Sequence, residues 1–161
     1  MQKITPFLWF NKEAEEAANF YTSVFPNSKV LHAARYSEAG AKAAGMPAGS
    51  VMTVVFQLQG QNFTAINGGP HFKFTEAVSF VINCDSQDEI DHYWGKLSEG
   101  GDPHAQQCGW LKDKYGLSWQ VVPSALGQLM SNPATAGNVM SAVLKMKKLD
   151  IKKLEEAGAA S

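Results

Sequence analysis

The sequence predicts an α+β fold in which two βαβββ modules form a curved mixed sheet and helices follow at the C-terminus. A strand–helix–strand–strand–strand order runs through residues 1–67 and returns, compressed, over residues 77–123. Apolar residues alternate in the strands and recur at i, i+3, i+4 and i+7 in the helices. Residues 68–76 indicate a linker and residues 124–161 a helical extension. We expect these parts to make one overall domain.

The composition is that of an ordinary globular chain, with 45% hydrophobic and 18% charged residues and a formal net charge of -1. Such a balance gives no attraction to nucleic acid or to acidic membranes. No apolar run approaches the roughly 20 residues that cross a bilayer, and the N-terminus has no signal or transit pattern. Cys84 and Cys108 form no CxxC or disulfide framework. We therefore expect a cytoplasmic protein without nucleic-acid or membrane partners.

The first module opens with an apolar, β-rich strand at residues 4–10. Asn11 is a candidate N-cap for the next helix, because acids occupy the first turns, where the helix dipole favours them. One face of that helix is apolar: Ala14, Ala17, Ala18, Tyr21, Val24 and Phe25. Further strands are expected at 29–36, 50–58 and 61–67. Residues 37–49, rich in Gly and Ala, indicate a mobile loop, and Gly60 a tight turn.

The second module repeats this order with less chain. Ser86 and Glu89 form a capping box for a helix that ends at Gly100-Gly101. The buried stripe of that helix is predicted as Ile90, Tyr93, Trp94 and Leu97. Strands are expected at 77–83, 104–111 and 117–122. Between Gly101 and His104 there is little room for a strand equivalent to 29–36, so this module is shorter.

The chain turns helical after Pro123. Asn132-Pro133 predicts an N-cap followed by proline at the first helical position. The apolar face of this helix is expected to contain Ala136, Val139, Met140, Val143 and Leu144. The four lysines between 147 and 153 indicate a solvated helix face rather than a polyanion site, because the overall charge is balanced.

The blocks "NGGPHFKFTEAVSFVINCDSQDEIDHYW" and "QCGWLKDKYGLSWQVVPSALGQLM", with the ending "VMSAVLKMKKLDIKKLEEA", resemble the PhnB-like branch of the vicinal-oxygen-chelate superfamily. This branch is labelled a 3-demethylubiquinone-9 3-methyltransferase domain. The resemblance covers nearly the whole chain. It implies the glyoxalase/bleomycin resistance fold, in which two modules form a cup that suits a small molecule.

Enzymes of the superfamily hold one divalent metal through histidines on the first strand and on the strand opening the second module, and through a glutamate on the last strand. The resemblance places Gln120 at the glutamate position and Ser79 at the second histidine position. Thr5, Pro6 or Phe7 falls at the first histidine position. None of these replaces imidazole or carboxylate, so we expect no superfamily-type metal and no cofactor. His32, His71, His92 and His104 lie elsewhere and are expected to be ordinary surface or hydrogen-bonded histidines.

Strand parity puts Ser118, Gln120 and Val122 on one face and Leu117, Trp119 and Val121 on the other. By the resemblance, the Gln120 face looks into the cup, and Trp119 packs behind it against a helix. The candidate ligand-binding residues are Gln120, Trp110, Cys108, Ser79, Asn67, Trp9 and Phe7. Three alternatives stay open: Cys108 as a small buried hydrophobe, Trp110 as core, and Gln120 as a partner of backbone groups.

Three functions fit these residues. The first is a protein that binds a small aromatic or amphiphilic ligand without the usual metal. The second is an enzyme, for which the branch label suggests methyl transfer, although no glycine-rich loop follows a strand to seat S-adenosylmethionine. The third is a metal enzyme with a rearranged ligand set that uses His32, Cys108 or glutamates. By analogy with relatives that pair modules between chains, we also expect a homodimer.

Overall fold

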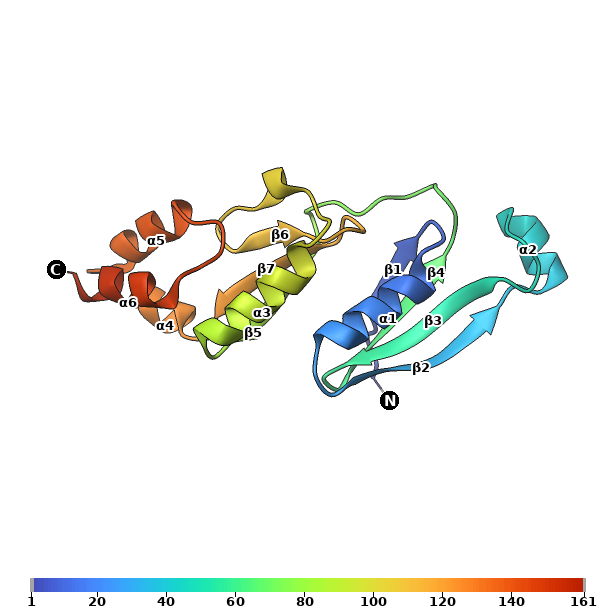
Figure 1. The fold of residues 1–161 in the computed structure, drawn as a ribbon, viewed down its shortest axis with the longest axis horizontal. Helices are drawn as coiled ribbons and strands as arrows, with labels where there is room; N and C mark the ends of the chain where they lie inside the picture. Colours follow the sequence, from blue (N-terminus) through green and yellow to red (C-terminus); the bar gives the residue numbers. More distant parts are fainter. Residues whose placement is uncertain (1, 161) are drawn as a thin grey trace. The chain divides into compact units, whose positions relative to one another are not determined.

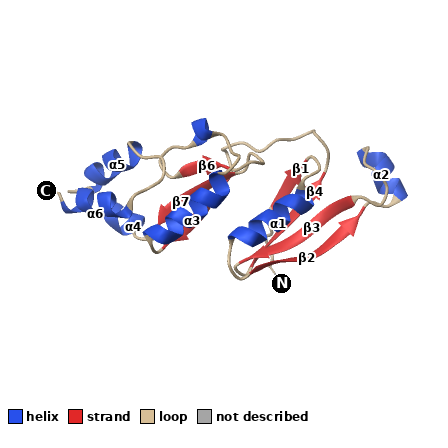
Figure 2. Cartoon of the chain, viewed as in Figure 1, coloured by secondary structure: helices blue, strands red, loops and turns tan. Residues whose placement is uncertain are grey.

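The structure, a computed structural model, describes residues 2–160 and divides into two compact units between Lys73 and Phe74 (Figure 1). Each unit has one sheet with one long helix against it, as Figure 2 shows by colour. The first unit contains β1 (Phe7–Phe10), α1 (Ala14–Val24), β2 (Ser28–Arg35), α2 (Glu38–Ala44), β3 (Val51–Leu58) and β4 (Gln61–Asn67). The second contains β5 (Ser79–Cys84), α3 (Gln87–Ser98), η1 (Pro103–Ala105), β6 (Trp110–Lys112), β7 (Ser118–Pro123), α4 (Leu126–Met130), α5 (Ala136–Leu144) and α6 (Ile151–Ala159). The predicted α+β class with C-terminal helices is confirmed.

The first sheet has the order β1-β4-β3-β2, with β1 parallel to β4 and the other neighbours antiparallel. Helix α1 lies across one face (Figure 1). All six apolar residues predicted for α1 are buried. They meet the inward side chains of the strands, among them Phe56, which stacks on Tyr21 with ring centroids 6.1 Å apart. This packing leaves the opposite sheet face to the alternate residues of each strand.

The start of α1 differs from the prediction. Asn11 is not its N-cap, because the helix begins at Ala14 and the cap position is held by Glu13, whose side chain makes no capping bond. Instead, the Ala14 N–H donates to Oδ1 of Asn67 at 2.8 Å. Asn67 is distant in sequence but lies at the end of β4, where the sheet brings it to the first turn of the helix. A cap supplied by another strand leaves no local sequence signal.

Residues 37–49 contain a helix, α2, where a mobile loop was expected. Ser37 caps it by accepting from the Gly40 N–H, and Gly45 ends it in the left-handed conformation with φ 69°. Both signals are present in the sequence, since serine favours N-caps and glycine favours the position after a helix. The high Gly and Ala content concealed them.

The second sheet has the order β5-β7-β6, with β5 parallel to β7 and β6 antiparallel to it. It matches the first sheet without an equivalent of β2. The four residues predicted for the buried stripe of α3 are all buried. Ser86 caps this helix by accepting from the Glu89 N–H, and Gly100, with φ 77°, follows its end as expected.

The strand predicted at 104–111 is shorter than expected, because β6 covers only Trp110–Lys112. Asp102 and Pro103 start a 3-10 turn, and Cys108 and Gly109 both have positive φ, 56° and 85°. A left-handed pair cannot continue an extended strand. The backbone of Gln107 still bridges that of Trp110 and covers the outer edge of β6 there.

The C-terminal extension has three short helices around a cluster of its own, formed by Val139, Val143, Leu149 and Leu154. The helix predicted after Asn132 begins at Ala136, because Asn132 caps the preceding turn instead. The extension is tied to the sheet by backbone bonds from Cys108 and Gly109 to the carbonyls of Met146 and Lys147, both at 2.8 Å. Gln87 of α3 adds bonds to the Leu149 carbonyl and the Ile151 N–H.

No helix within residues 2–160 is both long and apolar enough to cross a membrane.

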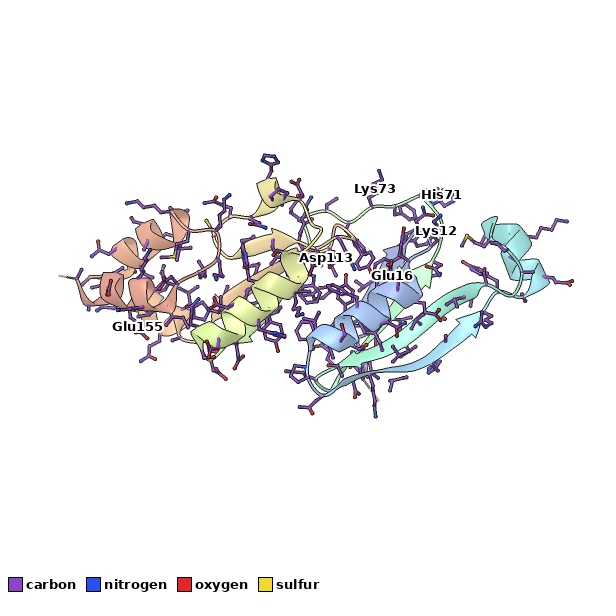
Figure 3. The ribbon with its side chains drawn as sticks, viewed as in Figure 1. Lys12, Glu16, His71, Lys73, Asp113 and Glu155 are labelled. Carbon is purple, nitrogen blue, oxygen red and sulfur yellow. The ribbon has the colours of Figure 1, made fainter. Side chains whose placement is uncertain are left out.

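Asp113, labelled in Figure 3, lies in the turn between β6 and β7, and its carboxylate stabilises that turn. Its side chain is 2% exposed. Oδ1 accepts from the N–H groups of Tyr115 and Leu117 at 2.9 and 3.1 Å, and Oδ2 accepts from the Trp119 indole at 2.9 Å. These three hydrogen bonds stabilise the negative charge of a buried carboxylate and fix the pairing of the two strands.

We predict that Asp113→Ala lowers the free energy of unfolding by about 2–4 kcal/mol, because three donors, two of them in buried hydrogen bonds, lose their acceptor. Chemical denaturation followed by circular dichroism measures the change. The matched control is Asp150→Ala, which removes only the exposed cap of α6 and should cost about 1 kcal/mol. Equal losses in the two variants would contradict the role given to Asp113.

Candidate functional site

The candidate site is the face of the second sheet opposite α3. In the β5-β7-β6 register, Gln120 of β7 lies between Val81 of β5 and Trp110 of β6. Paired residues point to the same side of a sheet. Gln120 Nε2 donates to Ser79 Oγ at 3.0 Å, which ties β7 to β5 on this face. Three predicted residues, Ser79, Trp110 and Gln120, are therefore brought together, and each is half-buried.

A second row on this face contains Ser79, Ser118 and Lys112. Lys112 Nζ forms an ion pair with Glu76, from the segment before β5. The hydrogen bond from Lys112 lowers the pKa of the Glu76 carboxyl below its usual value. Neither Ser118 nor Lys112 was among the predicted site residues. Strand parity could have found both, because Ser118 is two residues from Gln120 in β7, and Lys112 is two residues from Trp110 in β6.

Cys108 is not on this face as a strand residue. Its positive φ breaks the alternation that would align it with Trp110, and its side chain packs against the C-terminal cluster. Cys108 is half-buried there. The other cysteine, Cys84, is 1% exposed, and burial raises its pKa to about 12, helped by Glu89 and Asp85. It stays a thiol at neutral pH.

In the first unit, Phe7 and Trp9 lie on the sheet face opposite α1. They pair with Thr64 and Ile66 of β4, whereas Leu8 and Phe10 alternate with them and are buried toward the helix. Phe7 is 58% exposed. His32 shares this face, since its partner Val55 pairs in turn with Thr64.

The segment after β4 covers Trp9. The Trp9 indole N–H donates to the Gly69 carbonyl at 2.9 Å. The Phe72 ring contacts the Trp9 ring edge-on, with ring centroids 4.9 Å apart. A Cβ built at Gly68 would overlap the indole. His71 and Lys73, labelled in Figure 3, lie further along this segment. Residues predicted only as a linker therefore hold an aromatic side chain in one orientation.

Asn67 does not belong with Trp9, so its predicted place in the site is corrected. It pairs with Phe10 and faces α1. Its amide caps Ala14 and donates to the Val51 carbonyl at 3.0 Å. Asn67 is 6% exposed and serves the core of the first unit. The strand parity that aligned the other residues places Asn67 on the opposite face.

The residues at the superfamily's metal-ligand positions do not fit a divalent ion. Ser79 and Gln120 are neutral and bond to each other, and the chain at the start of β1 offers only Thr5, Pro6 or Phe7. Transition metals in such sites take imidazole and carboxylate ligands. Across residues 2–160, no three His, Cys, Asp or Glu side chains come together in an arrangement that could hold a metal.

Comparison with known structures defines the class of this protein. The fosfomycin resistance protein FosX from Listeria monocytogenes is 13% identical, aligns over 81% of this chain and 98% of its own, and gives a TM-score of 0.53. Protein PA1353 from Pseudomonas aeruginosa is 18% identical over 76% of this chain and 98% of its own, with a TM-score of 0.57. These likenesses show the fold alone: the chain has the α+β fold of the glyoxalase/bleomycin resistance proteins.

The family follows from closer matches. A family model described as 3-demethylubiquinone-9 3-methyltransferase matches residues 2–122. The PhnB protein from Bacillus cereus is 40% identical, aligns over 76% of this chain and 99% of its own, and has a TM-score of 0.64. No curated protein matches the chain. The chain belongs to the PhnB-like, 3-demethylubiquinone-9 3-methyltransferase family, which confirms the resemblance seen in the sequence.

We predict that Gly68→Ala lowers the free energy of unfolding by about 1–3 kcal/mol, because the added methyl group must displace the Trp9 ring. The matched control is Gly95→Ala in α3, where an added Cβ meets nothing within 4 Å and should stabilise the helix by up to about 1 kcal/mol. Thermal denaturation of both variants measures the difference. A Gly68→Ala protein as stable as wild type would show that Trp9 is not held as described.

Proposed function

We propose that this protein binds a small aromatic or amphiphilic organic molecule on the Gln120 face of the second sheet, without the metal of its superfamily. The observation that carries the proposal is the row formed by Trp110 and Gln120, with Ser79 bonded to Gln120. An indole offers a flat apolar surface at small entropic cost. The Gln120 amide and the serine hydroxyl can each donate and accept hydrogen bonds. In the first unit, Phe7 and Trp9 supply aromatic surface on the sheet of that unit itself.

Methyl transfer, which the family name suggests, is the second candidate. It is less well supported, because within residues 2–160 no glycine-rich loop joins a strand to a helix in the way that nucleotide-like cofactors require. The glycines at 68–69 cover Trp9, and Gly100-Gly101 follow the end of α3. We expect no heat of binding with S-adenosylmethionine at millimolar concentration in calorimetry, and a saturable signal would favour methyl transfer.

A thermal-shift screen of aromatic and quinone-like compounds tests ligand binding. For a compound that stabilises the wild type, we predict that Trp110→Ala and Gln120→Ala each weaken binding about tenfold or more, since each removes a central contact. Gln128→Ala, an exposed change in α4, is the matched control and should bind like wild type. Variants that fold normally and keep full affinity would contradict the proposed face.

Elemental analysis tests whether the ligand is bound without metal. We expect purified protein to carry no stoichiometric Mn, Fe, Ni or Zn. A metal at one equivalent per chain, lost on mutation of His32, Cys108 or a nearby glutamate, would instead support the rearranged metal enzyme.

A homodimer is a further part of this proposal. In α5, Val139 and Val143 face the C-terminal cluster, but Met140 and Leu144 are 41% and 58% exposed. We propose that a second copy covers these apolar side chains. Sedimentation at several concentrations should show a dimer that Leu144→Lys weakens, and a wild-type monomer at all concentrations would refute it.

A further inference from the structure

One row of the candidate face presents three hydrogen-bond donors. Ser79, Ser118 and Lys112 are aligned across β5, β7 and β6 by the strand register. Two are hydroxyls and the third is an ammonium group. Ser79 Oγ accepts from Gln120 Nε2, so its own proton is available to donate. Donors grouped around a positive charge suit an oxyanion.

Ser118 is the buried polar side chain in this row that lacks a partner. It is 1% exposed, and its Oγ has no hydrogen-bond partner among residues 2–160. Two other buried polar side chains, Asn67 and Asp113, are bonded through their side-chain oxygens. A buried hydroxyl without a partner is unfavourable, and it calls for a group that the protein itself does not supply.

The ion pair of Lys112 shows what kind of group suits this place. Its partner is a carboxylate, that of Glu76. The Glu76 side chain is 61% exposed, whereas that of Lys112 is only 25% exposed. Glu76 lies in a turn before β5 and not in a helix or strand. The Glu76 carboxylate can therefore move into water at small cost. When Glu76 leaves, the less exposed Lys112 ammonium group needs another anion as its partner.

We propose that Lys112, Ser118 and Ser79 form a subsite for the anionic end of the ligand, a carboxylate or a similar compact oxyanion, and that Glu76 occupies Lys112 until the ligand displaces it. This inference rests on the proposed function, because it describes one end of the same bound molecule. Along β7, Ser118 and Gln120 are two residues apart, which separates their rows by about 7 Å. The ligand is thus an aromatic acid whose ring lies on Trp110 and whose acid group reaches the next row.

The test compares 2-naphthylacetic acid with its neutral amide, 2-naphthylacetamide, by isothermal titration calorimetry on the full chain. The wild type should bind the acid about tenfold more tightly than the amide. Lys112→Met should remove this preference and leave the affinity for the amide unchanged. Glu76→Gln should strengthen binding of the acid several-fold, because it removes the internal competitor.

Two further variants make the test independent of folding. Ser118→Ala removes an unpaired buried hydroxyl, so it should fold as well as wild type while it weakens binding of the acid. Asp91→Asn breaks the exposed ion pair with Lys148 in the same unit and is the matched control, with no effect expected on either compound.

The outcomes separate the subsite from the proposed function. If the wild type binds both compounds equally, or the amide more tightly, the anionic subsite is refuted while ligand binding on this face stands. If Ser118→Ala and Lys112→Met keep the preference for the acid, the subsite is also refuted. If the wild type binds neither compound, the result counts against both proposals.

Discussion

The candidate site depends on the hydrogen bonds that the buried carboxylate of Asp113 accepts. It accepts from two backbone N–H groups of its own turn and from the Trp119 indole. The turn therefore has one geometry, and the register of β6 against β7 follows from it. A shift of one residue in that register would turn every side chain to the other face. Because the register holds, Trp110 lies opposite Gln120, and Lys112 lies opposite Ser118.

The same register explains how the candidate face is built from residues that do not suit a metal ion. The sheet fixes where side chains point, whatever their chemistry. On this face, Ser79 and Gln120 are neutral, and the Gln120 amide donates to the Ser79 hydroxyl. The charge on this face belongs instead to Lys112 and its partner Glu76. The charged side chains of this face therefore lie one row away from Trp110 and Gln120.

The second unit compensates for its missing strand with segments from elsewhere. Gln107 covers the edge of β6, and the chain at Met146 and Lys147 accepts from Cys108 and Gly109. The Met146 and Lys147 carbonyls belong to an extension that lies beyond the family match, which ends at residue 122. They draw Cys108 toward the C-terminal cluster and away from the candidate site.

The sequence by itself determined the α+β class, the family and the buried stripes of α1 and α3, because these depend on local periodicity and motifs. The family resemblance grouped Ser79, Trp110 and Gln120 on one face, and strand parity gave the residues that share a face within each strand. Only the tertiary structure decided the rest. Asn67 caps α1, and Glu76 forms the ion pair with Lys112. The C-terminal extension accepts the backbone hydrogen bond of Cys108. Each of these contacts joins two segments that are far apart in the sequence, and a local sequence pattern does not predict such a contact.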